Sequence, residues 1–229
     1  MTVDYLPLIP GSDLANRIRH SFNVLEQCFT KYTPNQIAVA FTGGKDCTVV
    51  LHLYSLVLHK KFPHSNKKPL FRAVFIHDKP QFDEVLQFID ETVQHYDMDL
   101  IRIQGRMNDA LNQLKSTHPE IQCLIMGTRL TDPYSSNLKD FSPTDPTWPA
   151  YMRCNPILHY FYNDIWSFLR QFDVPYCPMY DQGFTSLGDK ETTIRNPRLI
   201  YENDDTGLME YKPAYLLEDE ISERDGRVQ

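Results

Sequence analysis

Residues 37–47 read Ile-Ala-Val-Ala-Phe-Thr-Gly-Gly-Lys-Asp-Cys, and this stretch sets the class of fold. Its first five residues are apolar, as in a strand that is buried on both faces of a parallel sheet. Thr42, Gly43 and Gly44 end this run, and after Lys45 the apolar residues recur with the period of a helix. A buried strand that turns directly into a helix is typical of α/β proteins.

Strand and helix patterns alternate around this stretch as far as residue 126. Apolar residues at helical spacing predict helices, and short apolar runs predict further strands. The helices are expected at 12–33, 46–57, 82–93, 107–114 and 163–172, and the other strands at 70–76, 99–104 and 121–126. Strands joined by helices form right-handed parallel units, so we expect a three-layer α/β fold around a parallel sheet.

The chain is expected to form one domain over residues 1–229, because domains average about 150 residues. Three parts differ in character: an α/β core (12–126), a loop-rich part with one helix (127–213) and a charged tail (214–229). By composition alone the tail should fray into solvent, as chain ends do.

Charge and cysteine content exclude several classes of protein. The chain has 23 Lys and Arg against 30 Asp and Glu, and a net charge of −7 does not suit a nucleic-acid-binding surface. The five cysteines are widely spaced without a C-x-x-C pair, so they predict neither a disulfide framework nor a zinc site. With no basic signal region or membrane-length apolar stretch, we expect a soluble protein of the reducing cytoplasm.

The glycine turn at the end of the first strand is the first candidate binding site. In open α/β sheets, ligands bind at the carboxyl ends of the strands where the strand order reverses. Gly43 and Gly44 allow positive φ and close backbone approach, Lys45 adds a positive charge, and the helix from Asp46 directs free N–H groups to the same place. A plain strand-to-helix turn is the alternative, but Lys and Asp favour a phosphate cradle.

Arg129 and Asp132 follow the fourth strand, so the same argument places them beside this turn. Arg129 could instead make a surface salt bridge, and Asp132 could be a turn residue before Pro133. The residues alone leave both interpretations open.

Several motifs together carry a family resemblance. The Gly-Gly-Lys-Asp-Cys loop resembles the pyrophosphate loop of the ATP-pyrophosphatase and phosphoadenylyl-sulfate reductase superfamily. More specific motifs resemble eukaryotic FAD synthase, an FMN adenylyltransferase: Arg129-Leu-Thr-Asp-Pro-Tyr, Asp145-Pro-Thr-Trp148-Pro149, Met152-Arg153, Ile165-Trp-Ser-Phe-Leu, Gly183-Phe-Thr-Ser and Glu223-Arg-Asp-Gly-Arg227. The resemblance implies a nucleotide α-hydrolase-like fold with long loops and a closing tail.

It also implies the reaction FMN + ATP → FAD + pyrophosphate with Mg²⁺, by direct in-line attack of the FMN phosphate on the ATP α-phosphorus. Such a step needs positioning and charge stabilisation, and no activated nucleophile. The implied partners are the small molecules ATP and FMN, with no nucleic acid, no membrane and a monomeric chain. A nucleotide- or flavin-binding sensor of the same fold is the alternative. A reductase of the superfamily would need a nucleophilic cysteine near the C-terminus, and a tRNA-thiolating relative would need paired cysteines.

The resemblance further implies a set of site residues. ATP and its phosphates would contact Thr42, Gly43, Gly44, Lys45, Asp46, Ile76, Asp78 and Arg129. The flavin side would be Asp132, Asp145, Trp148 and Arg153. Lys45, Asp46, Arg224 and Arg227 would be catalytic, with Asp46 a candidate metal ligand beside the substrate phosphates. Without the resemblance, Trp148 would be interpreted as a core aromatic and Arg153 as a solvated cation.

Two expectations concern single positions. The family's loop usually opens with Asn where this chain has Thr42, and a hydroxyl reaches less far than an amide. Gly44 is expected to need a conformation or approach that a Cβ would block.

A third expectation concerns the tail. Removal of residues 222–229 should lower kcat strongly while barely changing thermal stability, if Arg224 and Arg227 clamp the phosphates.

Overall fold

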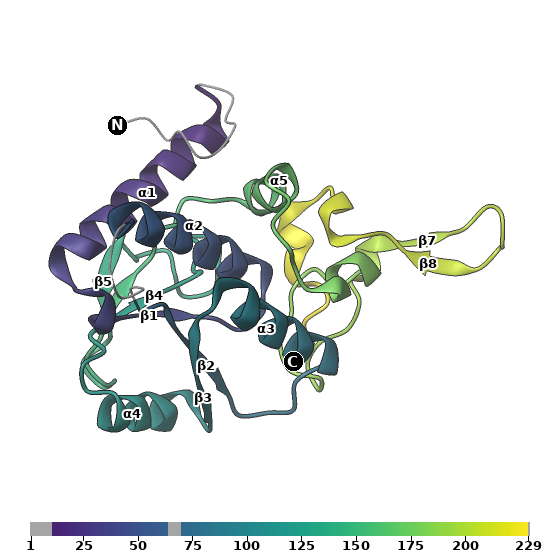
Figure 1. Ribbon diagram of the computed structural model, residues 1–229. Helices are drawn as coiled ribbons and strands as arrows, with labels where there is room; N and C mark the ends of the chain where they lie inside the picture. Colours follow the sequence, from purple (N-terminus) through teal and green to yellow (C-terminus); the bar gives the residue numbers. More distant parts are fainter. Residues whose placement is uncertain (1–10, 64–69, 229) are drawn as a thin grey trace.

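The structure is a computed structural model that describes residues 11–63 and 70–228. Helices and strands alternate over the first half of the chain (Figure 1). The helices are α1 (Asp13–Lys31), α2 (Lys45–Lys61), α3 (Asp83–Tyr96), α4 (Met107–Thr117) and α5 (Tyr162–Gln171). The strands are β1 (Ile37–Ala40), β2 (Arg72–His77), β3 (Asp99–Gln104), β4 (Cys123–Ile125), β5 (Phe141–Pro143), β6 (Met152–Cys154), β7 (Ile200–Glu202) and β8 (Met209–Tyr211).

Within the described residues, six strands form one sheet in the order β3-β2-β1-β4-β6-β5. All neighbours are parallel except β5, which runs antiparallel to β6. After β1 the chain builds the sheet outward through β2 to β3 and then returns to place β4 on the other side of β1. The order therefore reverses between β1 and β4, and a ligand site is expected at their carboxyl ends.

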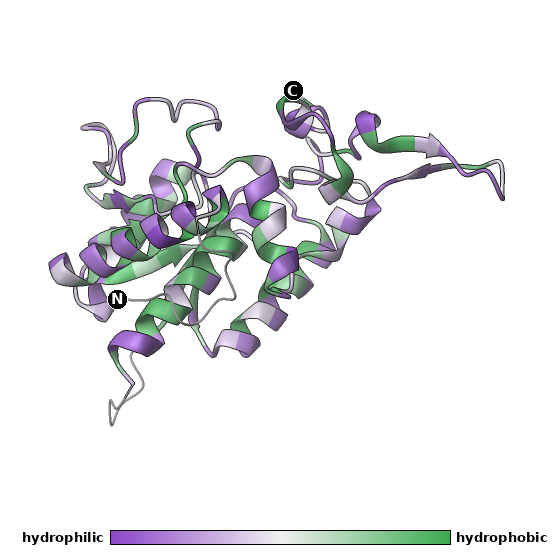
Figure 2. Ribbon diagram, turned by 90° about the horizontal axis from the view of Figure 1, so that it is seen from above, coloured by the Kyte–Doolittle hydropathy of each residue, from purple (hydrophilic) through white to green (hydrophobic). Residues whose placement is uncertain are grey.

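Helices cover both faces of the sheet, which confirms the predicted α/β class. Neighbouring strand residues point to opposite faces: Val39 joins the large core under α1, α2, α3 and α5, whereas Ala38 packs with α4. Helix α2 is buried on most of its surface, because it lies between the sheet and its neighbours α1 and α5. Figure 2 shows the apolar strands and the polar outer sides of the helices.

The sequence patterns predicted the core elements within a few residues, and Ser12 caps α1 by accepting from the backbone N–H of Ala15. They missed β5, β6 and the β7–β8 hairpin, which projects from the body of the protein (Figure 1). Each of these strands has three residues, too few to establish a period-2 pattern. Pro143 also disfavours a strand, and it is tolerated because β5 is an edge strand. No helix within the described ranges is long and apolar enough to cross a membrane.

Two glycines at this edge leave no room for a side chain: Gly43, as predicted, and Gly127, which sequence reasoning did not single out. Gly43 has φ +76°, and an added Cβ there would lie 3.1 Å from Val85. At Gly127 an added Cβ would lie 2.8 Å from the backbone nitrogen of Cys47. Gly44 does not need the special conformation that was expected: its φ is −73°, and a Cβ would make only ordinary contacts with the protein, the nearest at 3.6 Å. Close approach of a ligand to Gly44 stays a prediction.

We therefore expect Gly127→Ala to lower the free energy of unfolding by about 1–3 kcal/mol, because the backbone of α2 must move to admit the methyl group. Gly44→Ala is the control and should lose less than about 1 kcal/mol, because its Cβ makes only ordinary contacts although Ala is a poorer N-cap than Gly. Urea unfolding of both variants measures the difference. Equal stabilities would contradict the close approach at Gly127.

Candidate active site

The turn between β1 and α2 lies at the carboxyl edge of the sheet. Gly44 is the N-cap of α2, and Lys45 and Asp46 form its first turn. The backbone N–H of Lys45 donates to the hydroxyl of Tyr180 (2.8 Å), and Thr42 Oγ1 lies 3.5 Å from Cys47 Sγ. The first turn of a helix with its N–H groups and a lysine is suited to an anion.

Six charged side chains form one ion network beside this turn. Lys45 pairs with Asp46 (3.1 Å) and with Glu223. Arg129 Nη2 lies 2.7 Å from a Glu223 oxygen. The members are Lys45, Arg129 and Arg224 on the positive side and Asp46, Asp132 and Glu223 on the negative side. Three cations therefore face three carboxylates.

This network confirms the predicted meeting of the β1 and β4 turns. Arg129 Nε lies 2.9 Å from Asp46 Oδ1, and the backbone N–H of Arg129 donates to Asp132 Oδ2 (2.9 Å). Arg129 is 1% exposed, which excludes a surface salt bridge. Asp132 shapes the turn, as one interpretation held, and it also accepts from Arg224 (3.2 Å).

Neighbouring charges favour the ionised forms of Asp46 and Arg129. Burial by itself would raise the pKa of Asp46, but Lys45 and Arg129 outweigh it and the pKa of this carboxyl lies below its usual value. Burial would lower the pKa of Arg129, yet Asp46 and Glu223 raise it above that of a free guanidinium. Buried ions are tolerated only when paired in this way.

The tail is part of this site, so the expectation of a frayed tail was wrong. Glu223 is 9% exposed, and its backbone carbonyl accepts from Thr185 Oγ1 (2.7 Å). Further along, the Gly226 carbonyl accepts from the backbone N–H of Ile194 (2.9 Å). Arg227 donates to Thr193 Oγ1 (2.9 Å) and covers Gly188 so closely that an added Cβ would collide with its guanidinium. The tail is therefore a docked segment.

Arg224 and Arg227 give the docked tail two cations. Burial lowers the pKa of Arg227, and the nearby positive charge of Arg224 lowers it further. A cation whose charged form is disfavoured by a like neighbour gains most from a bound anion. Arg224 and Arg227 therefore form a local pair of cations in a tail that also carries Glu223 and Asp225.

The predicted contacts at β2 lie on the same edge of the sheet. Ile76 is the second-last residue of β2, and Asp78 comes directly after the strand. Because β2 is the parallel neighbour of β1, both residues lie at the same edge of the sheet as the turn after β1. Ile76 is half-buried and Asp78 is exposed.

The structure does not bring the four predicted flavin residues together. Asp132 is at the carboxyl edge, whereas Asp145 and Trp148 are in the turn before β6, at the amino edge. The chain reaches that edge because β5 runs antiparallel. Arg153 lies in β6 and donates to the Pro143 carbonyl (2.8 Å). The prediction of one flavin side formed by all four residues is thus corrected to two separate groups.

The Asp145–Trp148 turn borders a cleft of about 420 Å³. Its walls include Tyr32, Trp148 and Met152, and Trp148 is 37% exposed. Trp148 is therefore not the core aromatic of the alternative interpretation. Trp166 is the buried tryptophan, 5.2 Å from Tyr180 between ring centroids.

Sequence reasoning missed the roles of Glu223 and Tyr180. Glu223 belongs to the Glu-Arg-Asp-Gly-Arg motif, but an acidic residue is not expected where phosphates should bind. Tyr180 comes three residues before the Gly183 motif, and its burial cannot be read from its neighbours. The rings of Tyr162 and Tyr180 also face the ammonium of Lys45, at 5.2 and 5.9 Å from their centroids.

Comparison with known proteins agrees with this geometry. The phosphoadenosine phosphosulfate reductase domain matches residues 36–195. The probable FAD synthase of Schizosaccharomyces pombe is 36% identical over 93% of this chain and 80% of that protein. The probable FAD synthase of Caenorhabditis elegans is 38% identical over 94% of this chain, and this chain spans 41% of its length.

A solved structure is similar over nearly the whole chain. The crystal structure of Candida glabrata FMN adenylyltransferase, in complex with FMN and the ATP analogue AMPCPP, has a TM-score of 0.89 at 28% identity. The match covers 98% of this chain and 95% of that one. The docked tail and the edge strands are therefore included in the similarity.

We expect Glu223→Ala to destabilise the protein by about 3–5 kcal/mol, because it leaves Lys45 and Arg129 buried with too little negative charge. Removal of residues 222–229 should for the same reason lower the melting temperature, contrary to the expectation from composition. Glu218→Ala, at an exposed tail position, is the control. Thermal unfolding that is unchanged in Glu223→Ala would show that the ion network contributes nothing to stability.

Proposed function

Because the chain belongs to the FAD synthases of the phosphoadenosine phosphosulfate reductase domain family, we propose that it transfers the adenylyl group of ATP to FMN, giving FAD and pyrophosphate. The observation that carries this proposal is the cation cluster of Lys45, Arg129 and Arg224 at the strand-order reversal. The similarity to a complex with FMN and an ATP analogue supports it.

The proposed step is an in-line displacement. A phosphate oxygen of FMN forms a bond to the α-phosphorus of ATP, and the bond from that phosphorus to the bridging oxygen of the β-phosphate breaks. Pyrophosphate leaves with the bonding electron pair. The FMN phosphate already carries negative charge near neutral pH, so no general base is required. The protein needs only to position two anions and to offset their charge.

We assign the stabilisation of the phosphate charges to the start of α2 on one side of the site and to the docked tail on the other. Gly43, Gly44 and Lys45 would hold the triphosphate at the start of α2, with Arg129 beside them. Arg224 and Arg227 would approach it from the docked tail. In this structure Glu223 is ion-paired with both Lys45 and Arg129. An incoming phosphate must therefore share these two cations with Glu223 or displace its carboxylate.

The site fits Mg²⁺. Asp46 Oδ1 is buried and faces Arg129 Nε at 2.9 Å without forming a hydrogen bond, so this oxygen has ligand capacity left. Mg²⁺ is usually held by one or two carboxylates together with substrate phosphates. Asp46 would therefore hold the ion, which would offset charge on the phosphate oxygens when bound.

The nucleobase and the flavin ring would lie on different sides of the phosphates. We propose that Ile76 and Asp78 border the adenine, because they lie at the carboxyl end of β2, next to β1. Asp132 would contact the FMN end near the tail. The flavin roles of Asp145, Trp148 and Arg153 stay predictions, and in this geometry they require FMN to reach the cleft at the amino edge.

A sensor that binds nucleotide or flavin without turnover is the second candidate. The complete network of Lys45, Asp46 and Arg129 favours the enzyme, and release of pyrophosphate from ATP in the presence of FMN distinguishes the two. We also propose that the protein acts as a monomer. We place it in the reducing cytoplasm, since its five cysteines are free.

Asp46→Ala should lower kcat about 10²–10³-fold, because metal and phosphate organisation are lost together. Arg224→Ala should lower it by a similar factor, and Arg224→Lys should recover only part, because the bidentate guanidinium is absent. Arg106→Ala, an exposed arginine outside the site, is the control. Pyrophosphate release measures all four. Normal turnover in Asp46→Ala would refute the assignment of the cradle.

Trp148→Ala should raise the KM for FMN with little change in the KM for ATP, if the flavin ring stacks on the indole. Thr42→Asn should retain activity or gain slightly, since it restores the family's usual residue. Steady-state kinetics with each substrate varied in turn measure both. Unchanged KM for FMN in Trp148→Ala would move the flavin ring away from the amino-edge cleft.

A further inference from the structure

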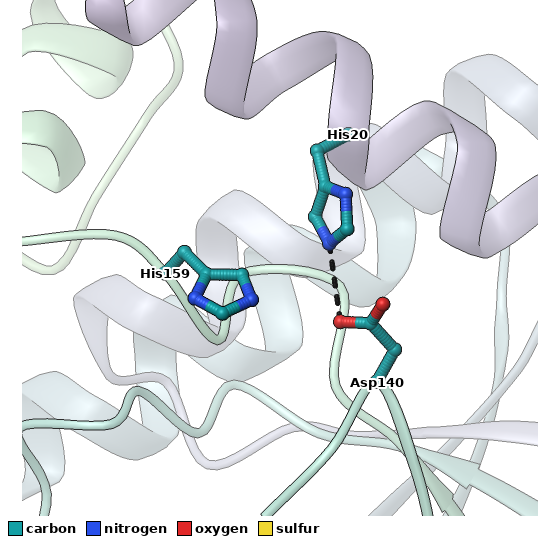
Figure 3. A group of neighbouring side chains, drawn as sticks. All are labelled: His20, Asp140 and His159. Atoms are coloured by element: carbon teal, nitrogen blue, oxygen red, sulfur yellow. Dashed lines mark hydrogen bonds and ion pairs between the residues drawn. The ribbon is translucent and has the colours of Figure 1, made fainter.

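Two histidines and an aspartate from three separate segments meet on α1, away from the ion network (Figure 3). His20 lies in the middle of α1, Asp140 immediately precedes β5, and His159 precedes α5. His20 Nε2 is 3.1 Å from Asp140 Oδ1, and the two imidazole rings meet edge to face at 5.3 Å. One nitrogen or oxygen from each residue lies within 4.8 Å of the other two.

The donor set is that of a transition-metal site. Imidazole nitrogen suits Zn²⁺ and its neighbours in the first row, whereas Mg²⁺ and Ca²⁺ prefer oxygen alone. Zn²⁺ binds nitrogen and carboxylate oxygen at roughly 2.0–2.2 Å in a tetrahedron, which puts its ligands roughly 3.3 Å apart. The His20–Asp140 separation of 3.1 Å already meets this requirement, and a ligand atom of His159 lies within 4.8 Å of both, so His159 must move closer to bind the same ion.

Hydrogen bonds to the backbone hold His159 and Asp140, and His20 lies within α1. Arg17 Nε donates to the His159 carbonyl (2.9 Å), and the backbone N–H of Asn155 donates to the Asp140 carbonyl (2.8 Å). Arg17 is itself paired with Asp164 (3.2 Å), so its charge is offset near the cluster. A site whose ligands are already held pays little ordering entropy when a metal binds.

We propose that His20, Asp140 and His159 bind a divalent transition-metal ion of the Zn²⁺ type, with water in the remaining position because His159 is exposed. The ion would join α1 to the segments before β5 and α5. The backbone N–H of Leu130 donates to the carbonyl of Leu158 (2.8 Å), the residue before His159. The metal would therefore steady the turn that carries Arg129, whatever reaction the ion network serves.

The test is titration of tag-free, metal-free protein with Zn²⁺, followed by calorimetry and thermal unfolding. We expect one ion per chain and, at about 100 times the dissociation constant, a melting temperature raised by about 5–10 °C. His20→Asn and His159→Asn should each weaken binding at least tenfold and reduce the thermal shift at the same Zn²⁺ concentration to about half or less. His95→Asn, an exposed histidine elsewhere, should behave as the unmodified protein.

A second measurement separates this site from the thiols. Co²⁺ bound at the three residues should give visible absorption without a near-ultraviolet thiolate band, because no cysteine is a ligand. A thiolate band, or Zn²⁺ affinity that is unchanged in both His20→Asn and His159→Asn, would overturn the proposal. Circular dichroism of the metal-free variants, expected to match the unmodified chain, shows that the loss of binding is not a loss of fold.

Discussion

The ion pairs of Glu223 with Lys45 and Arg129 hold the site together. They join three segments that are far apart in the sequence: the turn after β1, the turn after β4 and the tail. Each partner is nearly buried, and a buried ion is stable only when its counter-ion is present. The position of the tail and the burial of Lys45 and Arg129 both depend on this arrangement.

The sheet explains why these charges meet where they do. β1 and β4 are neighbours although β2 and β3 lie between them in the sequence, so two turns reach the same edge. The close approach at Gly127 then brings the backbone of the second turn against the start of α2. A reaction between two phosphates needs little more from a protein than fixed cations at such an edge.

The sequence predicted the helices and strands whose apolar residues recur with a clear period. It also predicted the contacts that follow from the general rules of parallel-sheet topology. The apolar runs located the strands around Ile37 and Cys123, and the switch-point rule brought Arg129 and Asp132 to the cradle. It could not locate β5 and β6, because three-residue strands carry no period. It also misplaced the tail: composition indicates a solvated segment, whereas burial of Glu223 depends on cations that are distant in sequence. The split between Asp132 and Trp148 follows from the antiparallel β5, which no local pattern indicated.

Glu223 lies 178 positions after Lys45, and this separation has a consequence for biosynthesis. Ribosomes add about 5–20 residues per second, so roughly 9–36 s pass between the synthesis of the lysine and that of its carboxylate partner. During this interval β1–β4 and their helices can already be folded, with Lys45 and Arg129 lacking their tail counter-ion. In the nascent chain Lys45 and Arg129 are thus balanced by Asp46 and Asp132 alone until translation passes residue 223.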